Sequence, residues 1–152
     1  MDNQLKSKTR LAFIQIIFQH LSTKNNVYEI LKTFDLNYKS TFVENFHNKK
    51  KIKFEFNSNY LKKLINYYYN LIETKNYLHL INKYINFDRK FEKWDIINKS
   101  ILLAILSEIE SSNISKMKII LNDYLNISRS FIDQNEISII NAILDKIINV
   151  KK

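Results

Sequence analysis

The sequence predicts an all-α protein with about seven helices, on the strength of three features. Apolar side chains recur three and four positions apart along most of the 152 residues, which is the spacing of one helical face. Glycine and proline, the residues that most often interrupt helices, do not occur. Hydrophobic residues make up 45% of the chain, so a single domain of this length has material for a core.

The N-terminal part of the chain contains two strong helical patterns and a less regular region between them. In residues 9–21, Leu11, Ile14 and Phe18 share one face. Ser58 is a candidate N-cap for the second pattern, an amphipathic stripe that continues to residue 85 as one bent helix or two. For the region between them we expect two short helices within residues 25–48, a solvated loop at 47–53 and a short extended piece at Phe54 and Phe56.

The C-terminal part predicts three more helices after a charged turn at residues 88–93. Residues 97–109 are apolar on nearly every side, which is typical of a buried helix. Helices follow at about 117–127 and 137–147, and Asp133 with Glu136 has the spacing of a capping box before the last one. No linker or repeat divides the chain. We therefore expect one domain, residues 1–152, with helical halves at about 1–87 and 88–152 and with frayed ends at 1–5 and 149–152.

The chain is strongly basic, with a formal net charge of +9 and a pI near 9.6. An excess of positive charge is typical of proteins that bind anionic partners, most often nucleic acids. A composition rich in Lys, Asn, Ile, Tyr and Phe produces the same charge without such a partner, so both interpretations stay open. No apolar run reaches the roughly 20 residues of a membrane span, and the first ten residues lack a secretion signal. We therefore expect a cytoplasmic protein without membrane contact.

Residues that carry catalytic or metal chemistry are few or absent. Without cysteine the chain has no thiolate nucleophile, and without glycine it has none of the loops that cradle phosphates. His20, His47 and His79 lack the spacing that places two ligands on one helical face. Asp133 and Glu136 fit helix capping better than acid–base catalysis. We expect a protein that is not an enzyme, with no catalytic residue, cofactor or metal.

A few polar and aromatic residues suggest where RNA could bind. Lys8 and Gln15 lie on one stripe of the first helix, where lysine supplies charge and glutamine can hydrogen-bond a base edge. Phe131, close to Arg129, is a candidate for stacking on an unpaired base. The other interpretation of this stripe, an ordinary solvated face, stays open on the pattern alone.

Three C-terminal segments and one N-terminal pattern carry a resemblance to a known family. Residues 97–109, INKSILLAILSEI, look like DRAILRLAxYEL; residues 120–131, ILNDYLNISRSF, look like AINEAVELAKxF; residues 139–147, IINAILDKI, look like FVNGVLDKI. Near the N-terminus, Arg10, Gln15 and Phe18 match RxxxxQxxY. In these segments the chain resembles the NusB family of transcription antitermination factors.

The chain departs from the family pattern in several positions. The arginine-rich N-terminal segment of the family is reduced here to Lys6, Lys8 and Arg10, and the Asp-Arg pair of the first motif is Asn98 followed by Lys99. The usual glycine of the last motif is Ala142. These changes affect predicted RNA contacts more than the predicted fold.

The resemblance implies an all-α fold of two small packed helical bundles and a role without catalysis. It implies a protein that pairs with NusE, a small-subunit ribosomal protein, and binds the single-stranded boxA element of nascent RNA. The pair then helps to assemble an antitermination complex on RNA polymerase, notably during ribosomal RNA transcription. Whether the free protein self-associates stays open.

The resemblance also assigns residues to the two interfaces. The RNA-binding candidates are Lys6, Lys8, Arg10, Gln15, Lys118 and Phe131. The partner-binding candidates are Phe18, Asn98, Asn135 and Ile139. Two other functions remain: a non-catalytic helical adaptor that binds only proteins, and a stand-alone RNA-binding module related to that of RNA cytosine methyltransferases.

Overall fold

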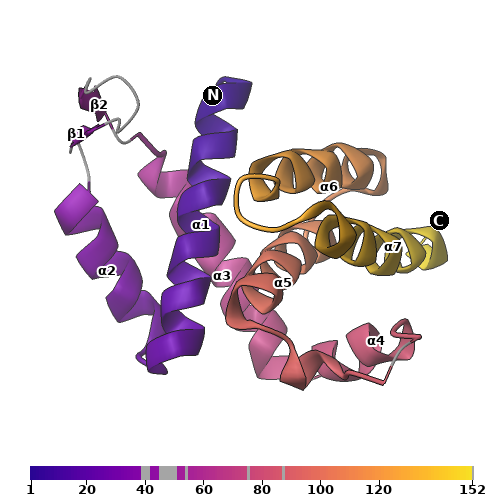
Figure 1. Cartoon of the computed structure of the whole chain (residues 1–152). Coiled ribbons are helices and arrows are strands. Elements are labelled where there is room, and N and C mark those ends of the chain that lie inside the picture. Colours follow the sequence, from indigo (N-terminus) through magenta and orange to yellow (C-terminus); the bar gives the residue numbers. More distant parts are fainter. Residues whose placement is uncertain (39–41, 45–50, 54, 75, 87, 152) are drawn as a thin grey trace.

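The computed structural model describes residues 1–38, 42–44, 51–53, 55–74, 76–86 and 88–151, and this part of the chain is all-helical apart from one small hairpin (Figure 1). The predicted fold class is therefore confirmed. The elements are α1 (Asn3–Thr23), α2 (Val27–Tyr38), β1 (Phe42–Glu44), β2 (Lys51–Lys53), α3 (Ser58–Thr74), α4 (Tyr77–Lys83), the 3-10 helix η1 (Phe91–Lys93), α5 (Ile96–Glu110), α6 (Ile114–Ser128) and α7 (Gln134–Lys151).

Helix α1 begins much earlier than its apolar pattern predicts. The Asp2 side chain accepts a hydrogen bond of 2.7 Å from the backbone N–H of Leu5, and Asn3 is the first helical residue. A capped turn that projects into solvent needs no apolar face, so the periodicity could not detect it. The expectation of frayed ends at residues 1–5 and 149–152 was wrong for residues 3–5, which belong to α1, and for residues 149–151, which belong to α7.

The region between α1 and α3 differs most from expectation. Phe42–Glu44 is a strand rather than part of a second short helix, and Lys51–Lys53 is its antiparallel partner rather than part of a loop. Val43 lies opposite Ile52 in the register. Short apolar runs do not distinguish helix from strand by spacing alone, and β-branched residues favour a strand. Residue 54 of the predicted extended piece lies outside the described residues, and the strand ends before Phe56.

The sequence spacing predicted the N-terminal cap of α7 correctly and that of α3 incorrectly. The capping box of α7 is confirmed: Asp133 Oδ1 accepts from the Glu136 N–H at 2.9 Å, and Glu136 Oε2 accepts from the Asp133 N–H at 3.2 Å. Ser58 does not cap α3. Asn57 accepts the Tyr60 N–H at 2.8 Å, whereas the Ser58 hydroxyl donates to Asp35 of α2 at 2.7 Å.

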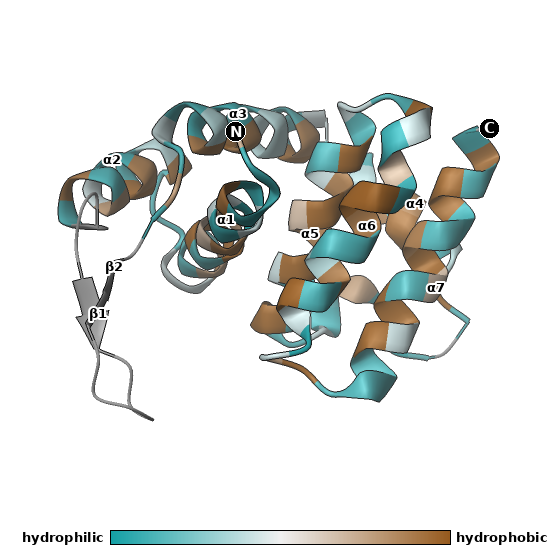
Figure 2. Cartoon of the chain, turned by 90° about the horizontal axis from the view of Figure 1, so that it is seen from above, coloured by the Kyte–Doolittle hydropathy of each residue, from teal (hydrophilic) through white to brown (hydrophobic). Residues whose placement is uncertain are grey.

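The centre of the molecule is the contact between α1 and α5. Figure 2 shows α1, α2 and α3 on one side and α4 to α7 on the other, so that α1 and α5 meet between the two groups. Every residue from Ser100 to Ile109 is buried, as predicted for this helix, because α5 packs against α1, α3, α6 and α7. The hydroxyls of Ser100 and Ser107 donate to carbonyls of their own helix, at 2.7 and 2.6 Å, so neither is buried without a partner.

One continuous hydrophobic core joins residues of both groups of helices. The boundaries proposed for two helical halves, at about 1–87 and 88–152, stay a prediction. Within the described parts of the chain, no helix has both the length and the apolarity required to cross a membrane.

Removing the α7 cap should destabilise the protein measurably. We expect Asp133→Ala to lower the free energy of unfolding by about 1 kcal/mol, since an N–H at the start of α7 loses its acceptor. Urea denaturation would measure this. Asp88→Ala, an exposed aspartate outside any helix, is the control and should leave the free energy within about 0.5 kcal/mol. Equal effects of the two changes would contradict the capping role.

Candidate functional site

Arg10 lies in a buried ion-pair network, with 7% of its surface exposed. Its guanidinium donates from Nε and Nη2 to the two carboxylate oxygens of Glu108, at 3.0 and 2.6 Å, and from Nη1 to Asp123 at 2.7 Å. A bidentate pair of this kind fixes the planar guanidinium in direction as well as in place. We therefore assign Arg10 to the packing of α1 against α5 and α6. This revises the RNA contact predicted for it, since phosphate binding would have to break these pairs.

Two tyrosines complete the network. The hydroxyls of Tyr124 and Tyr60 donate to Glu108, at 2.7 and 2.8 Å, so this one carboxylate receives hydrogen bonds from three helices. Burial, and secondly the negative charge of Glu108, raise the pKa of both tyrosines well above the ordinary value. Both hydroxyls therefore stay protonated at neutral pH.

A small apolar pocket brings together three of the predicted site residues. It has a volume of about 190 Å³ and is lined by Leu11, Ile14, Gln15 and Phe18 of α1, Ile97 of α5, and Phe131. Phe18 and Phe131 are 41% and 47% exposed, which is high for phenylalanine residues. Among the described residues of this lining, Gln15 is the polar one. The residue predicted to read a base and the residue predicted to stack on it thus line one cavity.

The remaining predicted RNA-binding residues do not join this pocket. Lys8 forms an ion pair of 3.7 Å with Glu55, and Lys118 pairs with Asp145 of α7. Lys6 lines a separate groove on another side of α1. Exposed pairs such as these are weak and can exchange for a phosphate. Of the six predicted RNA-binding residues, Gln15 and Phe131 therefore share a pocket, and the four basic residues lie outside it.

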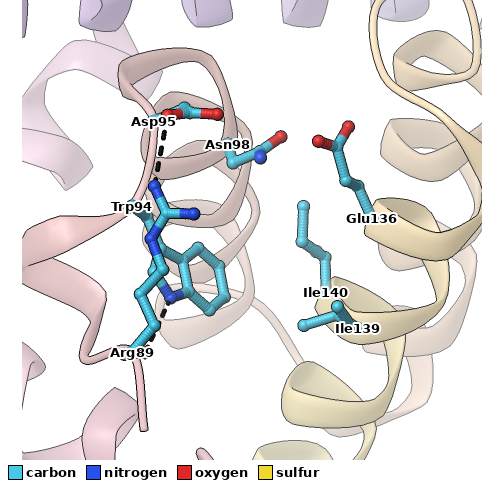
Figure 3. Close-up of a pocket in the computed structure, with 7 residues that line it drawn as sticks. All are labelled: Arg89, Trp94, Asp95, Asn98, Glu136, Ile139 and Ile140. Carbon is cyan, nitrogen blue, oxygen red and sulfur yellow. Dashed lines mark hydrogen bonds and ion pairs between the residues drawn. The ribbon is translucent and has the colours of Figure 1, made fainter. Parts of the chain in front are cut away.

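A second pocket contains two of the predicted partner-binding residues, Asn98 and Ile139 (Figure 3). It has a volume of about 130 Å³ and lies between the first turns of α5 and α7. Figure 3 shows the side chains of Asn98 and Glu136 pointing toward one another across it. The amide oxygen of Asn98 is buried and has no hydrogen-bond donor within the described residues. Ile139 supplies an apolar wall that is 39% exposed.

The other two predicted partner-binding residues lie nearby. Asn135 is exposed one turn before Ile139 on α7, and Phe18 belongs to the apolar pocket. Ile97 lines that pocket while its neighbour Asn98 lines the pocket of Figure 3. The two cavities therefore flank the first turn of α5.

Sequence analysis missed several residues around Asn98. Arg89, Trp94, Asp95 and Glu136 also line the pocket, and Arg89 pairs with Asp95 at 3.3 Å. In the sequence, the segment before α5 indicates only a charged turn at residues 88–93. Its lack of helical pattern gave no signal that it would close one side of a cavity, since that depends on how α7 packs. Among the residues that the structure describes, no cluster of three or more acidic or histidine side chains could hold a metal ion.

Comparison with known proteins identifies the class to which this fold and these surfaces belong. The sequence model of the NusB family matches residues 7–149, and the chain belongs to that family. Members of this family are non-catalytic transcription factors.

A curated relative shows the same relationship along nearly the whole length. The chain is 24% identical over 144 residues to the transcription antitermination protein NusB of Rickettsia typhi, and the match covers 93% of this chain and 90% of that protein.

Because the network is buried, removal of its cation, Arg10, should greatly lower the free energy of unfolding. Arg10→Met would leave the Glu108 carboxylate buried without an opposite charge, and we expect a loss of about 3–5 kcal/mol. The matched control is Arg89→Met, which breaks an ion pair that is more than half exposed and should cost less than about 1 kcal/mol. Chemical denaturation of both variants tests this. Similar losses would show that the network does not hold the helices together.

The buried tyrosines predict a loss of stability in alkali. The pKa of Tyr60, Tyr68 and Tyr124 is raised in the folded protein, mainly by burial. Above pH of about 10 the unfolded chain releases these protons while the folded chain keeps them, so the free energy of unfolding falls as the pH rises. Urea unfolding between pH 8 and pH 11 would measure the slope. Tyr68→Phe, which removes one titrating group, should make it shallower, and an unchanged slope would contradict the assignment.

Proposed function

We propose that this protein is a transcription antitermination factor that binds boxA-type single-stranded RNA together with NusE and supports ribosomal RNA transcription. Membership of the NusB family and the likeness to the Rickettsia typhi protein support the antitermination role. The observation that carries the RNA-binding part is the shared pocket of Gln15 and Phe131. The partners proposed are the RNA, NusE and the RNA polymerase complex that they enter.

The apolar pocket has walls on which one unpaired base could lie. An exposed aromatic residue such as Phe131 can stack on a base. Gln15 is exposed beside the pocket, and its amide could donate to and accept from a base edge on turning toward it. Lys8 lies on the same stripe of α1 as Gln15 and would supply charge on leaving Glu55. Phe18 lines the same cavity, so an occupant of the pocket would touch a residue assigned to the partner interface.

The pocket of Figure 3 supports the partner-binding part of the proposal. An apolar wall at Ile139 beside acceptors on Asn98 and Glu136 suits the polar edge of a protein interface, where hydrogen bonds surround apolar anchors. Because this pocket and the apolar pocket flank the same turn of α5, RNA and NusE would bind side by side. With adjacent sites we expect each partner to strengthen the binding of the other, since coupling between two ligands is reciprocal.

The second candidate is a protein-binding adaptor. The pairing of Lys8 with Glu55 and of Lys118 with Asp145 favours it, because these cations are already neutralised in the free protein. An apolar pocket rimmed by exposed phenylalanines can also hold a side chain of another protein.

Fluorescence anisotropy with a labelled boxA-type RNA separates the two functions. We expect weak binding by the protein alone and clearly tighter binding with NusE. Phe131→Ala should weaken the ternary complex about tenfold, since stacking contributes roughly 1–3 kcal/mol per base. Tyr28→Ala, which removes an exposed aromatic residue of α2, should have no effect. If NusE gives no gain and Phe131→Ala changes nothing, the adaptor is correct.

A further inference from the structure

A groove separate from both pockets lies between α1, α3 and the start of α6. Its volume is about 540 Å³, larger than that of either pocket already described. Lys6 enters it from α1, Lys63 and Tyr67 from α3, and Lys116 from α6. Arg10 and Glu108, part of the buried network, lie in its lining. The groove is therefore formed by the packing of four helices, α1, α3, α5 and α6.

The charge of this groove is strongly positive. Lys6, Lys63 and Lys116 form no ion pair within the described parts of the chain, unlike Lys8 and Lys118. The adjoining network of Arg10, Glu108 and Asp123 contains one positive and two negative charges, so the three lysines leave the groove and its surroundings net positive. Cations gathered around a concave surface produce a stronger local potential than the same charges spread over a convex one. This positive potential would favour the binding of an anion in the groove.

The groove also offers contacts beyond charge. The half-buried ring of Tyr67 lines it, with the ammonium group of Lys63 at 6.0 Å from the ring centre. Ser111 and Asn113, in the turn between α5 and α6, add a hydroxyl and an amide at its edge. An aromatic face beside unpaired lysines is the combination that proteins use for single-stranded nucleic acid, in which rings stack on bases and cations bind phosphates. An acidic peptide would use the lysines but would have no need of the ring.

We propose that this groove is a second RNA contact, in which Lys6, Lys63 and Lys116 bind phosphates of the strand and Tyr67 stacks on a base. The proposal rests on the function proposed above and extends the bound RNA beyond the Gln15–Phe131 pocket. No residue lines both cavities. The groove therefore binds nucleotides other than the one held in the pocket.

The test compares lysines that differ only in whether they face the groove. The double variant Lys63→Gln with Lys116→Gln removes two groove charges. The matched control is Lys62→Gln with Lys146→Gln, which removes two exposed lysine charges outside the groove, one of them on the neighbouring residue of α3. Binding of a boxA-containing single-stranded RNA with NusE is measured from 0.1 to 1 M salt. Circular dichroism confirms that all variants fold.

Each phosphate contact to a single strand contributes about 0.7 to the log–log salt slope. We expect the groove variant to lose about 1.4 from the slope and to bind about 25-fold more weakly at 0.1 M salt, a difference that disappears near 1 M. The control should keep the slope of the unmodified protein. Tyr67→Leu should weaken binding at every salt concentration without changing the slope.

Three results would overturn the proposal. One is an equal salt slope in the groove variant and its control. Another is loss of NusE binding in the groove variant with unchanged RNA binding, which would assign the groove to an acidic surface of a protein. The third is the absence of RNA binding by the unmodified protein, which would remove the proposed function as well. If Phe131→Ala weakens binding while the groove variant does not, the groove alone is excluded and the proposed function stands.

Discussion

The rest of the structure depends on the bidentate ion pair between Arg10 and Glu108. It joins α1 to α5 at the centre of the molecule, and Tyr60, Asp123 and Tyr124 extend it to α3 and α6. A buried guanidinium and carboxylate are costly to desolvate, and each is tolerated because the other neutralises it and because hydroxyl groups satisfy the remaining lone pairs. Apolar burial alone would allow these helices to pack in many orientations. Hydrogen bonds have fixed directions, so the network restricts the helices to a few of those orientations.

This arrangement determines which residues remain for ligands. An arginine that matches the basic N-terminal segment of the family is used inside the molecule, so the cations available to a partner are the lysines around it. Where α1, α3 and α6 meet at the network, Lys6, Lys63 and Lys116 surround a groove; where α1 meets the first turn of α5, Gln15, Phe18 and Phe131 surround a pocket. Both proposed RNA contacts are therefore consequences of how the same helices pack.

Sequence reasoning predicted the residues of the core better than those of the surfaces. The apolar pattern of α5 was enough to predict that most of this helix, Ser100 to Ile109, is buried, because helical periodicity is a local property that a single sequence displays directly. The motif match placed Gln15 and Phe131 among six RNA-binding candidates; these two line one cavity, and their contact with RNA stays a prediction. Arg10 was assigned to RNA by the same match, since a sequence does not show that Glu108, 98 positions further along, lies within hydrogen-bond distance. Lys63 and Tyr67 gave no signal, because an amphipathic helix normally has lysine and tyrosine at its margins.

By itself the sequence determined the helical class, the buried helix α5, the capping box of α7 and, through its motifs, the family. These features depend on neighbours within a few positions or on patterns that a family repeats. Only the tertiary structure decided which charges are neutralised, which aromatic rings remain exposed and which side chains share a cavity. Those properties depend on distances between residues that lie far apart in the sequence, from 27 positions for Lys118 and Asp145 to 116 for Gln15 and Phe131. Such distances are fixed by helix packing and not by local spacing.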